Sequence, residues 1–183
     1  MKPRFIFIHG NGGTDWRYAW AVWLKRKIEE LGFETIFETM PDPEKARASK
    51  WLPYLKDTLQ VNEEDVLIGY SSGAVAAMRY AESNQIRGSI LISPSYTDLG
   101  DPLEKHSGYF NDKWLWNDIK KNQKKIVMVW GDDDPYIPQS EFAYIVLHLG
   151  ADRIKIPMGE HFQHKQDFAE ILNYIKKTYV PKA

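Results

Sequence analysis

A serine between two glycines is the strongest candidate for chemistry in this sequence. Gly69-Tyr70-Ser71-Ser72-Gly73 matches G-x-S-x-G and lies between a predicted strand and a segment with helical spacing. Only small flanking residues fit there, because a strand that turns into a helix within one residue brings two backbones very close. This pattern indicates that Ser71 is a nucleophile for acyl transfer. The alternative is a tight turn whose serine only caps the helix. Ser72 also competes, but its flanking spacing is wrong.

A histidine downstream is the natural partner of such a serine. A serine hydroxyl is a weak nucleophile at neutral pH and needs a base, and the base needs a group that orients it. His161 follows an apolar run that ends at Ile156, and Gly159 allows a sharp turn just before it. We therefore predict that His161 is the base. The rival histidines are His9, His106, His148 and His164.

Three consecutive aspartates, Asp132, Asp133 and Asp134, follow the apolar run 125–129 and are the candidates for the orienting acid. The carboxyl ends of parallel strands meet at one edge of a sheet, so an acid and a histidine that each follow a strand come together there. A metal site made from the aspartates with His161 and His164 is the competing hypothesis. Nothing at a recognised ligand spacing supports it, so we expect neither a metal nor another cofactor.

Acyl transfer also needs backbone N–H donors for the oxygen that becomes negative. The N–H of Ser72 is one predicted donor. The second should come from the glycine-rich turn His9-Gly10-Asn11-Gly12-Gly13, where Asn11 is the best candidate. A phosphate-binding loop is the alternative function of this turn, but neither G-x-G-x-x-G nor G-x-x-x-x-G-K-[ST] is present.

Alternating strands and helices must position these residues. Short apolar runs bounded by glycine, proline or charged residues alternate with longer segments of helical spacing, which is typical of a parallel sheet. With right-handed crossovers, we predict a three-layer, doubly wound, mostly parallel α/β sheet of six strands in the order 2-1-3-4-5-6. The predicted strands are 4–8, 34–38, 65–68, 89–92, 125–129 and 153–156, and the predicted helices are 18–31, 43–59, 72–83, 114–120, 139–149 and 165–179.

Two local features refine this prediction. Asp42 before Pro43 fits an N-cap with proline at the first helical position. The longest irregular stretch, 93–113, has a length that is more often functional than idle.

Length and composition limit the possible functions. At 183 residues, the chain is predicted to form a single domain, 1–183, with no separate lid domain. The net charge of -1 gives no reason to expect nucleic acid or a membrane surface as a partner. There is no cysteine, so disulfides, thiolate zinc sites and a cysteine nucleophile are excluded. The apolar run 5–8 is too short for a signal peptide or a membrane span, so we expect a cytoplasmic protein.

Nearly the whole chain resembles the retinoblastoma-binding-protein branch of small serine hydrolases, which is related to the bacterial YdeN-like proteins. These are α/β-hydrolases without a large cap domain. The segments that carry the resemblance are Gly10-Asn11-Gly12-Gly13, Met40-Pro41-Asp42-Pro43 running on to Trp51-Leu52-Pro53, Ile68 to Glu82, Ser107-Gly108-Tyr109-Phe110, Asp134-Pro135, and Gly159 to Gln163.

The resemblance implies a triad of Ser71, Asp134 and His161. Asp134 is favoured because its D-P-x-x-P pattern resembles the acid loop of the family. The loop is one residue shorter than in animal relatives, so Asp132 and Asp133 stay alternatives. Animal relatives are linked to the retinoblastoma protein through L-x-C-x-E, and here the cysteine is replaced by Val61, so that partner is not expected.

We predict a serine hydrolase that cleaves a small ester or amide. The competing hypothesis is a binding or interaction protein on a hydrolase scaffold, because a fold does not fix a function. Aromatic residues near the motifs are candidate substrate contacts, with packing in the core as their alternative role. These candidates are Tyr70, Tyr109 and Phe162, and further aromatics in or near the long loop are Tyr96, Phe110, Trp114 and Trp116.

Overall fold

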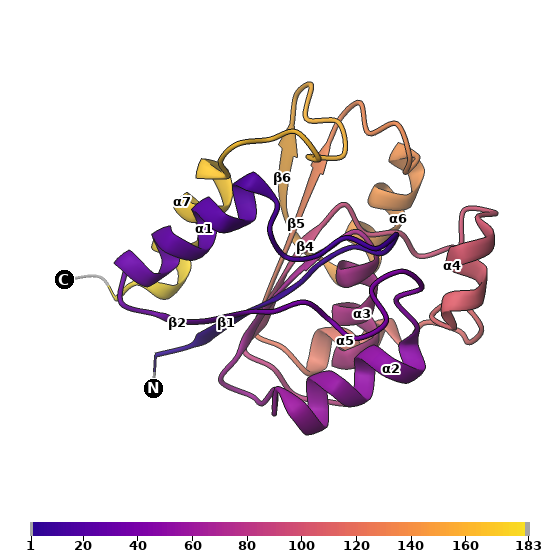
Figure 1. Cartoon of the computed structure of the whole chain (residues 1–183), viewed down its shortest axis with the longest axis horizontal. Coiled ribbons are helices and arrows are strands. Elements are labelled where there is room, and N and C mark those ends of the chain that lie inside the picture. The colour runs from indigo at the N-terminus through magenta and orange to yellow at the C-terminus, as the bar shows by residue number, and fades with distance from the viewer. Residues whose placement is uncertain (1, 182–183) are drawn as a thin grey trace.

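A six-stranded parallel sheet forms the centre of the computed structural model, which describes residues 2–181 (Figure 1). The strand order is β2-β1-β3-β4-β5-β6, which confirms the order predicted from the sequence. The strands are β1 (Arg4–Ile8), β2 (Glu34–Phe37), β3 (Val66–Tyr70), β4 (Gly88–Ile92), β5 (Lys125–Gly131) and β6 (Asp152–Ile156).

Helices cover both faces of this sheet, as the predicted three-layer architecture requires. Helices α1 and α7 pack on one face, and α2, α3, α5 and α6 pack on the other (Figure 1). The helices are α1 (Ala19–Glu30), α2 (Ala48–Pro53), α3 (Ser72–Ala81), α4 (Pro102–Ser107), α5 (Trp116–Lys121), α6 (Gln139–Leu149) and α7 (Ala169–Tyr179), and a π-helical turn, Tyr54–Thr58, continues α2.

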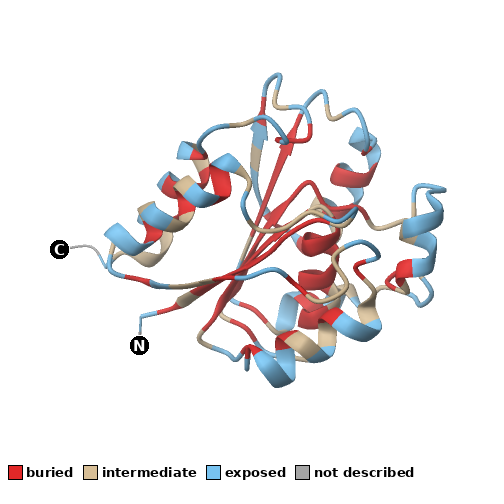
Figure 2. Cartoon of the chain, in the orientation of Figure 1, coloured by how far each residue is buried: buried red, intermediate tan, exposed pale blue. Residues whose placement is uncertain are grey.

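The apolar runs are continuous because the central strands are buried on both faces (Figure 2). In β1, Phe5 and Phe7 pack with α1 and α7, whereas Ile6 and Ile8 pack with the helices of the opposite face. Side chains alternate across a strand, so each apolar run supplies both layers of the core. Within residues 2–181, no helix is both long and apolar enough to cross a membrane.

The predicted helix 43–59 is wrong at its N-terminal end, because α2 begins at Ala48. Asp42 is not an N-cap: its φ is 55°, and its carboxylate bonds the guanidinium of Arg47 at 2.6 Å. The amides of Gly12 and Gly13 also bond the carbonyls of Glu44 and Pro43. These contacts hold 43–47 as a turn against the glycine-rich loop.

The stretch predicted to be irregular contains the short helix α4. Asp101 caps it by accepting hydrogen bonds from the amides of Leu103 and Glu104, Pro102 lies at its first position, and Gly108 ends it in the left-handed conformation. These are ordinary start and stop signals. The last helix also begins later than predicted, at Ala169 instead of residue 165.

Candidate active site

Ser71 lies at the sharp turn between β3 and α3, with φ 53° and ψ -121°. A non-glycine residue in this conformation is strained, and such strain is held only where the surroundings fix it. Its amide bonds the carbonyl of Ile92 at 2.8 Å, and its carbonyl accepts from Ala74 at 2.9 Å. A Cβ on Gly73 would lie 2.0 Å from the carbonyl oxygen of Ile8, so only glycine fits there.

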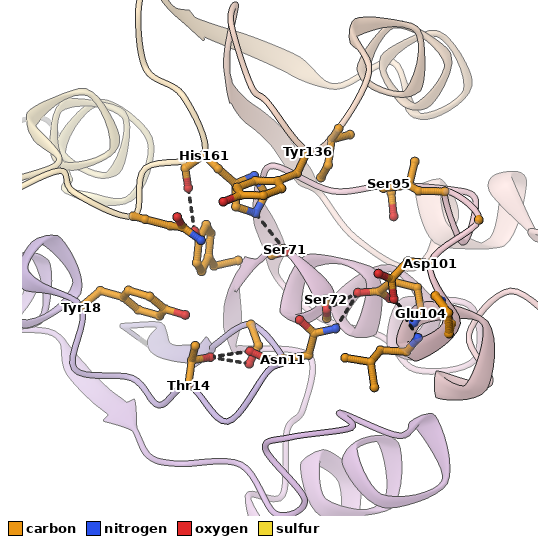
Figure 3. A pocket seen from close by; sticks show the side chains of 18 residues that line it. Asn11, Thr14, Tyr18, Ser71, Ser72, Ser95, Asp101, Glu104, Tyr136 and His161 are labelled. Atoms are coloured by element: carbon orange, nitrogen blue, oxygen red, sulfur yellow. Dashed lines mark hydrogen bonds between the residues drawn. The ribbon is translucent and has the colours of Figure 1, made fainter.

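His161 lies within hydrogen-bonding distance of both other residues of the predicted triad, and Figure 3 shows its ring beside Ser71. Nε2 of His161 is 3.1 Å from Oγ of Ser71, and Nδ1 of His161 is 2.7 Å from Oδ2 of Asp134. His161 lies in the loop after β6, and Asp134 lies in the loop after β5. These loops are neighbours because β5 and β6 pair in parallel, with Gly131 opposite Ile156.

Asp132 and Asp133 bind backbone amides, whereas Asp134 binds the imidazole of His161. Oδ1 of Asp132 accepts from the amide of Met158 at 2.9 Å, and Oδ1 of Asp133 accepts from the amide of Glu160 at 2.7 Å. Both carboxylates therefore hold the backbone of the histidine loop, and only Asp134 reaches the imidazole.

Asp134 is kept ionised by its surroundings. Burial alone raises its pKa, but the hydrogen bond and charge of His161, together with the amides of Tyr136 and Ile137, bring the pKa below its ordinary value. A carboxylate there can hold Nδ1 protonated and leave Nε2 free to accept a proton. The histidine backbone is also fixed, because the hydroxyl of Tyr70 donates to the carbonyl of His161 at 2.6 Å.

The other histidines have structural or surface positions. His9 is buried between two backbone partners, the carbonyl of Gly10 at 2.6 Å and the amide of Met40 at 2.8 Å. Burial lowers its pKa, so it stays neutral and ties the first loop to the segment after β2. Within residues 2–181, no three His, Asp or Glu side chains are grouped as a metal ion would require. His106 and His164 are exposed, and His148 is half-buried.

The two residues predicted to supply oxyanion donors lie beside Ser71 and share a partner. Ser72 is the first residue of α3, where backbone N–H groups lack intrahelical acceptors. Its hydroxyl donates to Oε1 of Glu104 at 2.8 Å, and the side-chain amide of Asn11 donates to the same oxygen at 2.7 Å (Figure 3). Sequence reasoning did not identify Glu104.

A cavity of about 590 Å³ opens above Ser71. Its lining, all within the described part of the chain, includes two carboxylates, Asp101 and Glu104, and neither lysine nor arginine. Residues that sequence reasoning missed also line it, namely Tyr18, Leu99, Leu103, Tyr136 and Gln163. Tyr136 had a usable signal, because it follows the Asp134-Pro135 pair directly.

Only one of the aromatic candidates, Tyr70, lines this cavity. The expectation that Tyr109 and Phe162 contact substrate needs correction, because both are buried, at 1% exposure each. Tyr109 packs in the core on the α3 face of the sheet, and Phe162 packs on Phe168 at a ring distance of 4.9 Å. Instead of lining the cavity, Tyr96, Phe110, Trp114 and Trp116 pack against the core.

Comparisons with known proteins show that the chain resembles serine hydrolases along almost its whole length. The family model described as serine hydrolase matches residues 5–177. Serine hydrolase RBBP9 of Rattus norvegicus is 39% identical over 178 residues, which cover 96% of this chain and 95% of the rat protein.

Solved structures share the fold. The ydeN gene product of B. subtilis superposes with a TM-score of 0.85 at 22% identity, covering 96% of this chain and 97% of that one. Est1E from Butyrivibrio proteoclasticus has a TM-score of 0.72 at 19% identity, covering 96% of this chain and 86% of that one. The architecture is a minimal α/β-hydrolase fold.

Proposed function

Since the chain belongs to the serine hydrolase family, we propose that it cleaves small esters or amides through an acyl-enzyme on Ser71, with His161 as base and Asp134 as the orienting acid. The observation that carries this proposal is the unbroken hydrogen-bonded path from Oγ of Ser71 through both ring nitrogens of His161 to Oδ2 of Asp134.

In the first half-reaction, Oγ of Ser71 bonds to the substrate carbonyl carbon while its proton passes to Nε2 of His161. The carbonyl oxygen takes up the displaced electron pair and becomes negative beside the backbone N–H groups of Asn11 and Ser72. Collapse of this intermediate breaks the ester or amide bond, and His161 gives its proton to the leaving alcohol or amine. Asp134 stays ionised throughout and balances the imidazolium.

In the second half-reaction, water replaces the leaving group. His161 takes a proton from the water, the water oxygen bonds to the acyl carbon, and the bond to Ser71 breaks as His161 returns its proton to Oγ. A carboxylic acid leaves, and the side chains are restored. These steps need nothing beyond the residues around the cavity and water.

A fluorophosphonate probe tests the proposal directly, because it reacts with an activated serine and not with an ordinary one. We expect the purified protein to gain one adduct, and peptide mass spectrometry to locate it on Ser71. His161→Ala should remain folded but label slowly, because the base is gone. Ser72→Ala is the matched control and should still be labelled.

An unlabelled, folded protein would favour the competing hypothesis of a binding protein on a hydrolase scaffold. Labelling on any serine other than Ser71 would also contradict the proposal. Label on Ser71 together with turnover of a short p-nitrophenyl ester supports it.

A further inference from the structure

Glu104 connects two loops that are far apart in the sequence. Its Oε1 accepts hydrogen bonds from the side chains of Asn11, in the loop after β1, and of Ser72, at the start of α3. These are the two residues whose backbone N–H groups would stabilise the oxyanion. Among residues 2–181, no other side chain forms hydrogen bonds with the side chains of both Asn11 and Ser72, and Figure 3 shows the two bonds meeting at Glu104.

The carboxylate of Glu104 is largely withdrawn from solvent. Burial raises its pKa, while the hydrogen bonds from Ser72 and Asn11 oppose that rise. Its other oxygen, Oε2, is buried and has no hydrogen-bond partner among residues 2–181. Burying a carboxylate costs free energy unless its oxygens are paired, so its place in this structure needs a structural or functional reason.

The helix that bears Glu104 is fixed independently. Asp101 caps the N-terminus of α4, and the hydroxyl of Ser107 donates to the carbonyl of Glu104 at 2.6 Å. Tyr109 also lies near Glu104, and its buried hydroxyl has no hydrogen-bond partner among the described residues. Burial raises the pKa of this phenol, and the charge of Glu104 raises it further. The phenol therefore stays protonated.

We propose that Glu104 is a positioning residue for acyl transfer: by holding the side chains of Asn11 and Ser72 on one oxygen, it sets the separation and direction of the two backbone donors of the oxyanion hole. This inference rests on the proposed function. Glu104 touches neither the serine oxygen nor the acyl carbon, and it acts through the two loops that it connects.

Three variants separate positioning from charge and from helix stability. Glu104→Ala removes the shared acceptor, Glu104→Gln keeps a carbonyl oxygen that can accept from both donors, and Lys105→Ala is the matched control on the exposed side of α4. With p-nitrophenyl acetate as substrate, we expect Glu104→Ala to lower kcat by about 10- to 100-fold. This decrease is no larger than the decrease in kcat that follows removal of a whole oxyanion donor. We expect Glu104→Gln to stay within about fivefold of wild type, and Lys105→Ala to be unchanged.

The inhibition constant of an aryl trifluoromethyl ketone distinguishes a positioning role of Glu104 from a merely structural one. Its adduct with Ser71 places an oxyanion in the hole, whereas the ground-state substrate does not. We expect Glu104→Ala to raise the inhibition constant of this ketone by the same factor by which kcat/KM falls, with little change in KM.

A double-mutant cycle identifies the path of the effect. Asn11→Ala removes the amide that Glu104 holds but keeps the backbone N–H. If Glu104 acts through Asn11, then Asn11→Ala in the Glu104→Ala background should cost little more than Glu104→Ala alone. Fully multiplicative losses would overturn the inference.

The controls distinguish this inference from the proposed function. If wild type hydrolyses the ester and labels on Ser71, but Glu104→Ala matches it within threefold in kcat and ketone affinity, only the positioning role fails. If wild type neither hydrolyses nor labels, the proposed function fails, and the positioning role fails with it. An equal loss in Glu104→Gln and Glu104→Ala would also contradict it.

Discussion

The hydroxyl oxygen of Ser71 is the atom to which the acyl group would bond, so its removal is the most direct test at the scale of a single residue. We expect Ser71→Ala to abolish turnover of p-nitrophenyl acetate and to leave the circular dichroism spectrum unchanged, because alanine reduces the crowding at this turn. Residual hydrolysis within tenfold of wild type would contradict the assignment.

The adjacent serine is the matched comparison. Ser72→Ala removes one hydrogen bond to Glu104 but keeps the backbone N–H, so we expect kcat to fall by less than about tenfold, the value of one hydrogen bond. Steady-state kinetics under the same conditions should therefore separate the two serines by several orders of magnitude. A loss in Ser72→Ala as large as in Ser71→Ala would point to the wrong nucleophile.

For the acid, Asp134→Asn is expected to lower kcat by several orders of magnitude. In a comparable site, changing the triad aspartate to asparagine lowers kcat by about ten-thousandfold, because the imidazole then takes the wrong tautomer. Asp132→Asn and Asp133→Asn should lose far less activity, since their carboxylates bond backbone amides. If Asp133→Asn were the most damaging of the three in ester hydrolysis, Asp134 would not be the orienting acid.

Glu104 carries a prediction about stability and pH. Its pKa is raised in the folded protein, so the folded state binds a proton more tightly than the unfolded state does. The free energy of unfolding should therefore fall as the pH rises from the ordinary glutamate pKa, about 4.3, through the raised value. Glu104→Gln should not show this part of the pH dependence. Urea titrations of both proteins between about pH 4 and pH 8 measure the difference, and parallel curves would contradict it.

At the scale of the elements, Gly73 decides how closely α3 approaches β1. An added Cβ would meet backbone atoms of Ile8 and His9 at 2.0 and 2.5 Å, and backbone cannot move aside as a flexible side chain can. We expect Gly73→Ala to lower the free energy of unfolding by about 1–3 kcal/mol. In a chain of this size, that corresponds to a melting temperature lower by about 2–12 °C.

Gly10→Ala is the control for this thermal measurement. Its added Cβ would make only ordinary contacts, the nearest at 3.6 Å from Cβ of Ser71. Calorimetry should therefore show a much smaller shift for Gly10→Ala than for Gly73→Ala. Equal shifts would mean that loss of glycine flexibility, rather than the close approach of two backbones, explains the effect.

The elements that could be predicted are those with a strong local pattern. The central strands β3 and β4 are apolar runs that are buried along their whole length, and α6 has the predicted bounds 139–149. Errors arose where tertiary contacts override local preference. Asp42 pairs with Arg47 instead of capping a helix, and the amides of Gly12 and Gly13 hold the neighbouring turn.

The same distinction holds for the site. The proximity of Ser71, Asp134 and His161 was predictable, because each follows a strand in a recognisable loop. Glu104 was not, since its partners are 93 and 32 residues away and no spacing rule connects them. Tyr109 was assigned wrongly because an aromatic residue in a loop can face either the cavity or the core, and composition does not distinguish these.

At the scale of the whole molecule, the open cavity limits what can be bound. Leu99, Leu103 and Tyr136 line it and remain partly exposed, at 36%, 41% and 59%, so no further layer covers its mouth. An extra methylene stabilises binding by about 0.8 kcal/mol only when it is buried. We therefore expect acetyl to butyryl p-nitrophenyl esters to be hydrolysed faster than esters of about ten carbons or more. A kcat/KM that rises steadily with chain length would contradict this.

The place of β6 has a consequence for how such an enzyme loses activity. This strand is at the edge of the sheet, pairs with β5 alone, and exposes Asp152, Arg153 and Lys155. His161 follows it by five residues, while Ser71 follows the fully buried β3. Edge segments fray at a lower free energy than the global unfolding of a protein. We therefore expect warming or mild denaturant to withdraw His161 from Ser71 while the core is still intact. Ester hydrolysis should then be lost at a lower temperature than the melting transition seen by circular dichroism, and coincident transitions would contradict this.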